Sequence, residues 1–164
     1  MEYAYTYRDP ERLYLNATNR CTNRCSFCVR YRSRGLGAAV LWGEPEPDME
    51  MLRNAIEIRG GLEGFSEFIW CGFGEPTFRL DLIMEAAPWL REGGARIRLN
   101  TNGHANLIHN RNVLPELAEA VDEASVSLSA PNCSRYQELC RPNPAVIFNP
   151  GGRCLQAGVF WDAF

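Results

Sequence analysis

The feature that most constrains the fold is a regular alternation of two kinds of segment. Short apolar runs rich in strand-forming residues are expected as strands at 13–18, 68–71, 97–101 and 125–129. Four stretches of helical periodicity separate or follow these strands. They start after Asp48, span 78–91, surround Pro115 and span 132–140. Such an alternation is typical of successive βαβ units, whose strands form a parallel sheet. The sequence therefore predicts an α/β fold with about four strand-helix units.

The alternation stops near Pro142. Residues 143–164 contain two prolines and three glycines, which divide them into pieces too short for a long helix. A chain of 164 residues with 46% hydrophobic content has enough apolar side chains for one core and leaves little room for a second. We therefore expect one core domain over residues 1–142, followed by a divergent or truncated C-terminal tail over residues 143–164.

Composition excludes several classes of function. All 17 basic residues are arginines, so no lysine amine is present to form a Schiff base with a carbonyl substrate. A net charge of -3 argues against a general nucleic-acid binder, which needs a basic excess to neutralise phosphates. The longest apolar runs are too short to cross a bilayer, and no export signal is visible at the N-terminus. We expect a cytoplasmic protein that binds neither nucleic acid nor membrane.

Three cysteines follow the first expected strand. Cys21, Cys25 and Cys28 form a C-x3-C-x2-C array, and no histidine lies nearby. Three thiolates suit a cubane iron-sulfur cluster in which one iron keeps a coordination site open to a small molecule. A structural zinc site would normally need a fourth ligand, so zinc and plain buried thiols are the alternatives. The other cysteines are widely spaced, and we expect Cys71, Cys133, Cys140 and Cys154 to be dispensable for a cluster.

Glycines and polar side chains follow the later strands. The run CGFGEPT occupies residues 71–77, LNTNG occupies residues 99–103, and Ser127 and Ser129 lie on the fourth expected strand. Glycines allow backbone carbonyls to approach a ligand, and a carboxylate such as that of Glu75 can accept hydrogen bonds from an ammonium group. Ligands bind at the carboxyl ends of parallel strands in α/β folds. Ordinary Gly-Pro and Asn-Gly turns are the alternative interpretation.

Together these motifs resemble the radical S-adenosylmethionine (radical SAM) superfamily. The array C-x3-C-x-aromatic-C is its signature, and residues 72–76 look like its glycine-glycine-glutamate-proline motif with Phe73 inserted. The resemblance implies a partial (β/α) barrel with a [4Fe-4S] cluster on Cys21, Cys25 and Cys28 at the carboxyl rim of the strands. Reduction of the cluster would cleave SAM to methionine and a 5'-deoxyadenosyl radical that acts on a substrate the sequence does not identify.

The same resemblance assigns the contacts to SAM. Phe27 is expected near the adenine, and the other candidates are Gly72, Gly74, Glu75, Pro76, Asn100, Asn102, Ser127 and Ser129. Within the superfamily, the run LYLNATNRCTNRC at residues 13–25, together with GEPT, LNTNG and LCRP, looks like the TatD-linked radical SAM proteins. That likeness covers about residues 10 to 142 and names no substrate.

Positive charge surrounds the cysteine array, contributed by Arg20, Arg24, Arg30, Arg32 and Arg34. It could stabilise an anionic cluster or bind an acidic electron donor of the flavodoxin or ferredoxin type, and solvated loop charge is the alternative. His104 and His109 are expected to be polar loop residues rather than ligands. Two other functions stay open: an activase that installs a glycyl radical on a partner protein, and a noncatalytic iron-sulfur or metal-binding scaffold.

Overall fold

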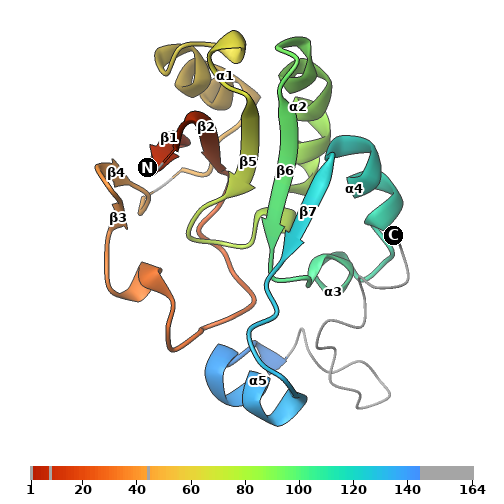
Figure 1. Cartoon of the computed structure of the whole chain (residues 1–164). Coiled ribbons are helices and arrows are strands. Elements are labelled where there is room, and N and C mark those ends of the chain that lie inside the picture. Colours follow the sequence, from red (N-terminus) through yellow and green to blue (C-terminus); the bar gives the residue numbers. More distant parts are fainter. Residues whose placement is uncertain (1, 8, 44, 145–164) are drawn as a thin grey trace.

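The main sheet of the molecule contains four parallel strands in chain order. The computed structural model describes residues 2–7, 9–43 and 45–144, and its sheet has the order β1-β2-β5-β6-β7 (Figure 1). The strands are β1 (Ala4–Tyr7), β2 (Asp9–Asn16), β5 (Glu67–Cys71), β6 (Arg96–Thr101) and β7 (Glu123–Val126). Within this sheet, only β1 runs antiparallel to its neighbour. A separate two-stranded ribbon, β3 (Gly35–Leu36) with β4 (Ala39–Val40), lies within the long loop that follows β2. The α/β class and the parallel sheet predicted from the sequence are confirmed.

Helices connect these strands and cover one face of the sheet. The described residues contain five α-helices: α1 (Met49–Ile58), α2 (Leu80–Glu92), α3 (Ala105–His109), α4 (Leu114–Ala120) and α5 (Cys133–Cys140). Short 3-10 turns occupy Val29–Tyr31, Leu62–Gly64 and Pro76–Arg79. Asp48 caps α1 by accepting a hydrogen bond from the Met51 amide at 2.8 Å, as its position before the helical pattern predicts. Leu52 and Ile56, four residues apart, supply the buried face of α1.

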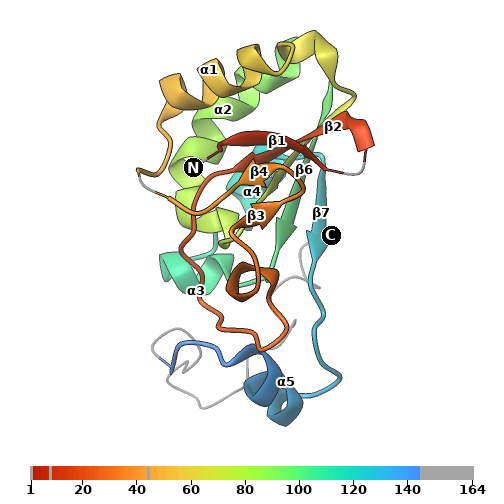
Figure 2. The ribbon, with the colours of Figure 1, turned by 90° about the vertical axis from the view of Figure 1, so that its left-hand side faces the viewer.

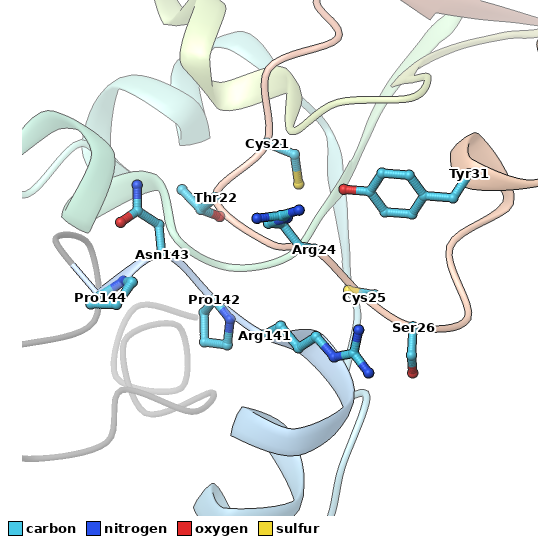
Figure 3. A pocket seen from close by; sticks show the side chains of 10 residues that line it. All are labelled: Cys21, Thr22, Arg24, Cys25, Ser26, Tyr31, Arg141, Pro142, Asn143 and Pro144. Carbon is cyan, nitrogen blue, oxygen red and sulfur yellow. The ribbon is translucent and has the colours of Figure 1, made fainter.

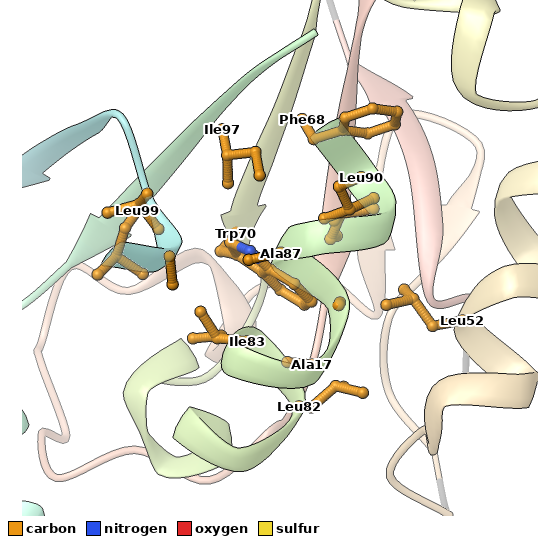
Figure 4. Packing of buried hydrophobic residues seen from close by; sticks show 14 of the residues in the cluster. Ala17, Leu52, Phe68, Trp70, Leu82, Ile83, Ala87, Leu90, Ile97 and Leu99 are labelled. Carbon is orange, nitrogen blue, oxygen red and sulfur yellow. The ribbon is translucent and has the colours of Figure 1, made fainter. Parts of the chain in front are cut away.

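The core lies between the sheet and its helices. Strand register places Leu13, Phe68 and Ile97 in one row across β2, β5 and β6, and Leu15, Trp70 and Leu99 in the next row. All six side chains are buried, and Leu52, Ile83 and Leu90 from the helices belong to the same cluster (Figure 4). Because side chains alternate along a strand, these rows place every second residue against the helices.

The opposite face of the sheet carries a smaller aromatic cluster. Tyr14 stacks on Tyr5 of β1 with ring centroids 5.5 Å apart, and Tyr7 meets Tyr14 edge-on at 6.4 Å. Tyr5 and Phe73 are buried here together with residues of the ribbon. The N-terminal strand β1 therefore extends the sheet next to β2 and covers part of the face that the helices leave open.

Several element boundaries differ from the sequence-based expectations. The first parallel strand ends at Asn16 rather than residue 18, and β7 ends at Val126, so Ser127 and Ser129 follow the strand instead of lying on it. Strand β1 and helix α3 were not expected; His109 is the last residue of α3 and His104 precedes it. The last expected helix, at residues 132–140, is present as α5. It stands beyond the carboxyl ends of the strands, away from the helices on the sheet (Figure 2).

Two further expectations concern the chain as a whole. In the part of the chain that the structure describes, no helix is both long enough and apolar enough to cross a membrane. Most of the tail expected over residues 143–164 lies outside the described residues, which end at Pro144. The division between core and tail is therefore still a prediction.

Candidate functional site

The long loop after β2 carries the three cysteines of the array. Cys21 and Cys25 line an open cavity of about 880 Å³, together with Thr22, Arg24, Ser26, Tyr31 and residues 141–144 (Figure 3). Cys28 lies three residues farther along, just before the 3-10 turn at Val29–Tyr31. All three thiols are free and partly exposed. The cavity volume falls within the range of small-molecule and cofactor sites.

The three thiols interact electrostatically with one another. Burial is the main cause of a raised pKa at Cys21, and Cys28 contributes to it. Burial also raises the pKa of Cys25 to about 12, with Cys140, Cys21 and Cys28 adding to the effect. Cationic iron reverses this preference, because metal binding replaces the thiol protons. Three interacting thiols in one loop, two of them on the wall of an open cavity, therefore fit an iron-sulfur cluster.

Within residues 2–7, 9–43 and 45–144, no three side chains of the His, Cys, Asp or Glu type are already arranged around the position of a metal ion. A cubane cluster presents separate irons to separate thiolates, so its ligands do not converge on one atom.

Backbone hydrogen bonds attach the cysteine loop to the end of α5. The Arg24 amide donates to the Cys140 carbonyl at 2.9 Å, and the Ser26 amide donates to the Leu139 carbonyl at 2.8 Å. The Cys25 thiol contacts the Cys140 thiol between these two bonds. The end of α5 thus holds Cys25, the central cysteine of the array. More than 100 residues separate Cys25 from Cys140 in the sequence.

Four buried side chains form a second attachment, which we call the buried polar chain: Thr22, Asn23, His104 and Tyr136. His104 Nδ1 lies 2.9 Å from Thr22 Oγ1, and its Nε2 lies 3.1 Å from the Tyr136 hydroxyl. Asn23 Nδ2 donates to the same hydroxyl at 2.9 Å. Burial lowers the pKa of His104 to about 4. His104 does lie in the loop before α3, and its ring is buried between the cysteine loop and α5.

The glycine-rich turn after β5 packs against the start of the cysteine loop. The Glu75 amide donates to the Arg20 carbonyl at 2.8 Å. A methyl group on Gly74 would stand 2.3 Å from the Thr18 carbonyl oxygen, so only glycine allows this approach. Gly72 has a φ of 124°, which glycine adopts without strain.

Glu75 joins this turn to the end of β6. Its carboxylate accepts hydrogen bonds from the Thr77 hydroxyl at 2.8 Å, the Thr101 hydroxyl at 2.6 Å and the Asn102 amide at 2.7 Å. Burial raises the pKa of Glu75, while these donors oppose the rise. Asn102 then reaches the cysteine loop, because its side-chain nitrogen lies 2.8 Å from Thr22 Oγ1 and 3.9 Å from Cys21 Sγ. The structure thus brings together Cys21, Glu75 and Asn102, as the strand order predicts.

The other candidate residues are more scattered. Phe27 is 50% exposed, and Ser127 is exposed just beyond β7. The Asn100 side chain hydrogen-bonds the Cys71 thiol at the end of β5. Pro76 is buried at the start of a 3-10 turn. Ser129 is half-buried farther along the segment that leads to α5.

The five arginines around the array separate into two groups. Arg20 pairs with Glu46 at 2.9 Å, and Arg30 donates to the Asn19 and Phe73 carbonyls at 3.2 Å each, so both hold the loop together. Arg24, Arg32 and Arg34 are exposed. Arg20 is exposed as well, with 54% of its side chain accessible, but Glu46 offsets its charge.

Sequence reasoning missed the residues that hold the cysteine loop. Thr22 and Asn23 lie inside the array, and His104, Tyr136 and Cys140 come from distant segments. A signal was present for the first two, because polar residues between metal-ligating cysteines often orient the ligands. Nothing local in the sequence marks Tyr136 or Cys140 as their partners.

Comparison with known proteins agrees with this geometry at the level of a family. No curated protein matches the chain. The family model described as "Radical SAM superfamily" matches residues 15–147, which include the end of β2, the cysteine loop, the strands β5, β6 and β7, and α5. Because this match covers well over half of the sequence, the chain belongs to the radical SAM superfamily.

Proposed function

We propose that this protein is a radical SAM enzyme whose [4Fe-4S] cluster is bound by Cys21, Cys25 and Cys28. The observation that carries the proposal is a loop with three free thiols, two of which line an open cavity, in a chain that matches the family over residues 15–147. When bound and reduced, such a cluster supplies the electron that cleaves SAM to methionine and a 5'-deoxyadenosyl radical. The residues of this chain hold the thiolates, bind SAM beside them and limit access of water.

The topology supports a partial barrel as the scaffold. Strands β2, β5, β6 and β7 follow one another both in sequence and in the sheet, and α1, α2 and α4 pack on one face. Such a singly wound order is what a (β/α) barrel requires, since each crossover moves one strand in the same direction. The cysteine loop, the turn at 72–76 and Asn102 all follow carboxyl ends of these strands. We infer that the cavity at this rim is the reaction site.

SAM contacts follow from the same geometry. We propose that the turn containing Gly72, Gly74, Glu75 and Pro76 offers backbone acceptors to the SAM ammonium. Glu75 is buried and already accepts several hydrogen bonds, so its contribution includes fixing Asn102 next to Cys21. We assign the remaining contacts to Phe27, Asn100, Asn102, Ser127 and Ser129. Glu75→Gln should weaken SAM binding while the iron content stays at the wild-type value.

The decisive experiment is anaerobic reconstitution followed by iron, sulfide and product analysis. The wild-type chain should hold four irons, and reduction in the presence of SAM should give 5'-deoxyadenosine. Cys21→Ala, Cys25→Ala and Cys28→Ala should each lose the cluster, while Cys71→Ala serves as a matched control and should keep it. A full cluster in Cys21→Ala, or iron without SAM cleavage, would contradict the proposal; the second result would favour a noncatalytic scaffold.

Finer assignments belong to the same proposal. We propose that residues 10–142 place the chain with the TatD-linked radical SAM proteins. This assignment leaves the substrate unidentified. We propose a cytoplasmic enzyme reduced by a flavodoxin- or ferredoxin-type donor that binds near exposed Arg24, Arg32 and Arg34. Transfer of deuterium from labelled SAM to a small molecule, rather than to a glycine of a partner protein, would separate this enzyme from a glycyl-radical activase.

A further inference from the structure

The donors and acceptors of the buried polar chain determine in which direction its hydrogen bonds run. Its four members, Thr22, Asn23, His104 and Tyr136, are each 5% exposed or less. A buried donor or acceptor without a partner is destabilising, so a chain of this kind favours the direction that leaves the fewest protons unpaired in the interior.

Asn23 is the first donor in the chain. Its Nδ2 can only donate, so the Tyr136 oxygen accepts that bond, which leaves the tyrosine proton available for His104 Nε2 at 3.1 Å. Burial keeps the His104 ring neutral by lowering its pKa to about 4. A neutral imidazole that accepts at Nε2 carries its proton on Nδ1, and that proton then points to Thr22 Oγ1 at 2.9 Å.

Thr22 is the end of this chain. Its oxygen also accepts from Asn102 Nδ2 at 2.8 Å, so both of its lone pairs are used and its own proton points elsewhere. Thr22 forms part of the wall of the cavity between Cys21 and Arg24 (Figure 3). The opposite direction would place two donors on the Tyr136 oxygen and leave the tyrosine proton in the interior. The Thr22 proton is therefore the one donor of the chain that is left over, and it belongs to a residue that lines the cavity.

We propose that the Thr22 hydroxyl donates a hydrogen bond to an anionic sulfur in the cysteine cavity, and that Asn23, Tyr136 and His104 set the direction of that donor. The proposal rests on the proposed function, since the acceptor is a thiolate or sulfide sulfur of the bound cluster. Hydrogen bonds to such sulfurs stabilise the reduced, more negative state and so raise the reduction potential. Thr22 is then a tuning residue, and Tyr136 and His104 are positioning residues that act through it.

The first test reads the direction of the chain without a cluster. The sequence has only two histidines, so nitrogen-15 labelling of histidine gives two imidazole patterns in the full-length apoprotein. His109 Nε2 lies 2.7 Å from the Thr77 carbonyl, which can only accept, so His109 should carry its proton on Nε2. His104 should show the opposite tautomer, with its proton on Nδ1. An Nε2 proton on His104 would mean that the chain runs from Thr22 toward Asn23, and it would overturn the proposal.

The second test reads the effect on the reconstituted protein. Thr22→Val removes the hydroxyl and keeps the shape, whereas Thr22→Ser keeps the hydroxyl. In titrations followed by electron paramagnetic resonance, the Val variant should have a more negative reduction potential than wild type, and the Ser variant should stay at the wild-type potential. Tyr136→Phe should shift the potential in the same direction by less. Tyr3→Phe, which removes a hydroxyl bound to the Pro45 carbonyl at 3.1 Å, is the matched control and should not shift it.

The two tests fail in different ways. A wild-type chain that assembles no cluster would overturn the proposed function and with it the sulfur acceptor, while the His104 tautomer would still decide the direction of the chain. A cluster that forms normally but has the same potential in Thr22→Val and Thr22→Ser would overturn this proposal alone. If Thr22→Val does not fold, equal potentials in wild type and Tyr136→Phe give the same negative answer.

Discussion

The sheet with its helices and the cysteine loop with α5 are stabilised by different forces. In the first region, rows of buried apolar side chains such as Leu15, Trp70 and Leu99 pack against α1 and α2. In the second region, Thr22, His104 and backbone groups of α5 hold the loop by hydrogen bonds, and its apolar cluster is small. Packing energy rises with buried area, whereas each hydrogen bond adds only about 0.5–1.5 kcal/mol.

This difference implies that the scaffold and the site respond to different changes. Exposed apolar side chains are frequent near the cysteines, where Phe27, Val29 and Tyr31 are 50%, 42% and 53% exposed. The loop therefore gains little from burial and depends on correct geometry at a few polar contacts. We expect mutations in the core to change global stability, and mutations at the loop to change the cluster site at a smaller cost to stability.

The largest effect is expected for a deletion in the core. Leu90→Ala on α2 removes a fully buried side chain and should lower the free energy of unfolding by about 2–5 kcal/mol, because a cavity remains. Leu128→Ala makes the same chemical change at a side chain that is 66% exposed, and it should stay within about 0.5 kcal/mol of wild type. Urea denaturation of the two variants measures both values. Equal losses would show that the helix-covered core does not carry the stability of the described chain.

The next effect is expected where the two regions touch. Gly74→Ala would place a methyl group 2.3 Å from the Thr18 carbonyl oxygen and 2.4 Å from that of Arg20, so the loop must move. Overpacking of this kind costs about 1–3 kcal/mol, and the displaced loop should also bind less iron after reconstitution. Gly64→Ala is the control, since nothing lies within 4 Å of an added methyl group there. Normal iron content in a destabilised Gly74→Ala protein would show that the turn does not position the cysteines.

The sequence predicted the first region better than the second. Apolar periodicity placed β5, β6 and α2, because burial against a sheet imposes a period that can be recognised locally. It missed α3, which has only five residues, and β1, whose pairing with β2 depends on a partner strand rather than on its own pattern.

At the site, the position of charged and polar groups was predictable but their partners were not. The cysteine spacing and the resemblance to a family identified the loop, and strand order brought Glu75 near Asn102. The contacts of Thr22 with His104 and of Arg24 with Cys140 join segments 82 and 116 residues apart, so no local pattern records them. Such contacts depend on how α5 is placed, which the sequence left open.

A third effect concerns pH and tests whether the loop is held by a neutral histidine. The pKa of His104 is lowered from 6.5 to about 4, so the unfolded chain binds more protons than the folded chain between these values. The stabilisation is complete above about pH 6.5 and is lost as the pH falls toward 4. At a pH of about 5 the loss should be on the order of 2 kcal/mol. Urea denaturation of wild type and His104→Asn at two pH values measures this pH-dependent loss of unfolding free energy. The loss should occur in wild type and be absent from the variant. His109→Asn should keep the wild-type pH dependence.

The smallest effect gives the sharpest comparison, because the same kind of cap occurs in both regions. Asp48 accepts from the Met51 amide at 2.8 Å at the start of α1, and Asn132 accepts from the Arg135 amide at 3.0 Å at the start of α5. Replacing either cap by alanine should cost about 1 kcal/mol of helix stability. The costs are similar, but their consequences should differ. Fraying of α1 leaves the cysteine loop untouched, whereas fraying of α5 loosens the Cys140 and Leu139 carbonyls that hold Arg24 and Ser26.

Asn132→Ala should therefore bind less iron, and Asp48→Ala should keep the wild-type amount at the same loss of unfolding free energy. Hydrogen exchange at the Arg24 and Ser26 amides provides a direct measurement, since both donate to the end of α5. These amides should exchange faster in Asn132→Ala and at the wild-type rate in Asp48→Ala. Asn132→Asp is the conservative control, because an aspartate can still cap the helix. If both alanine variants lost iron in proportion to their stability, the cysteine loop would depend on the whole fold rather than on α5, and the separation of the two regions would be wrong.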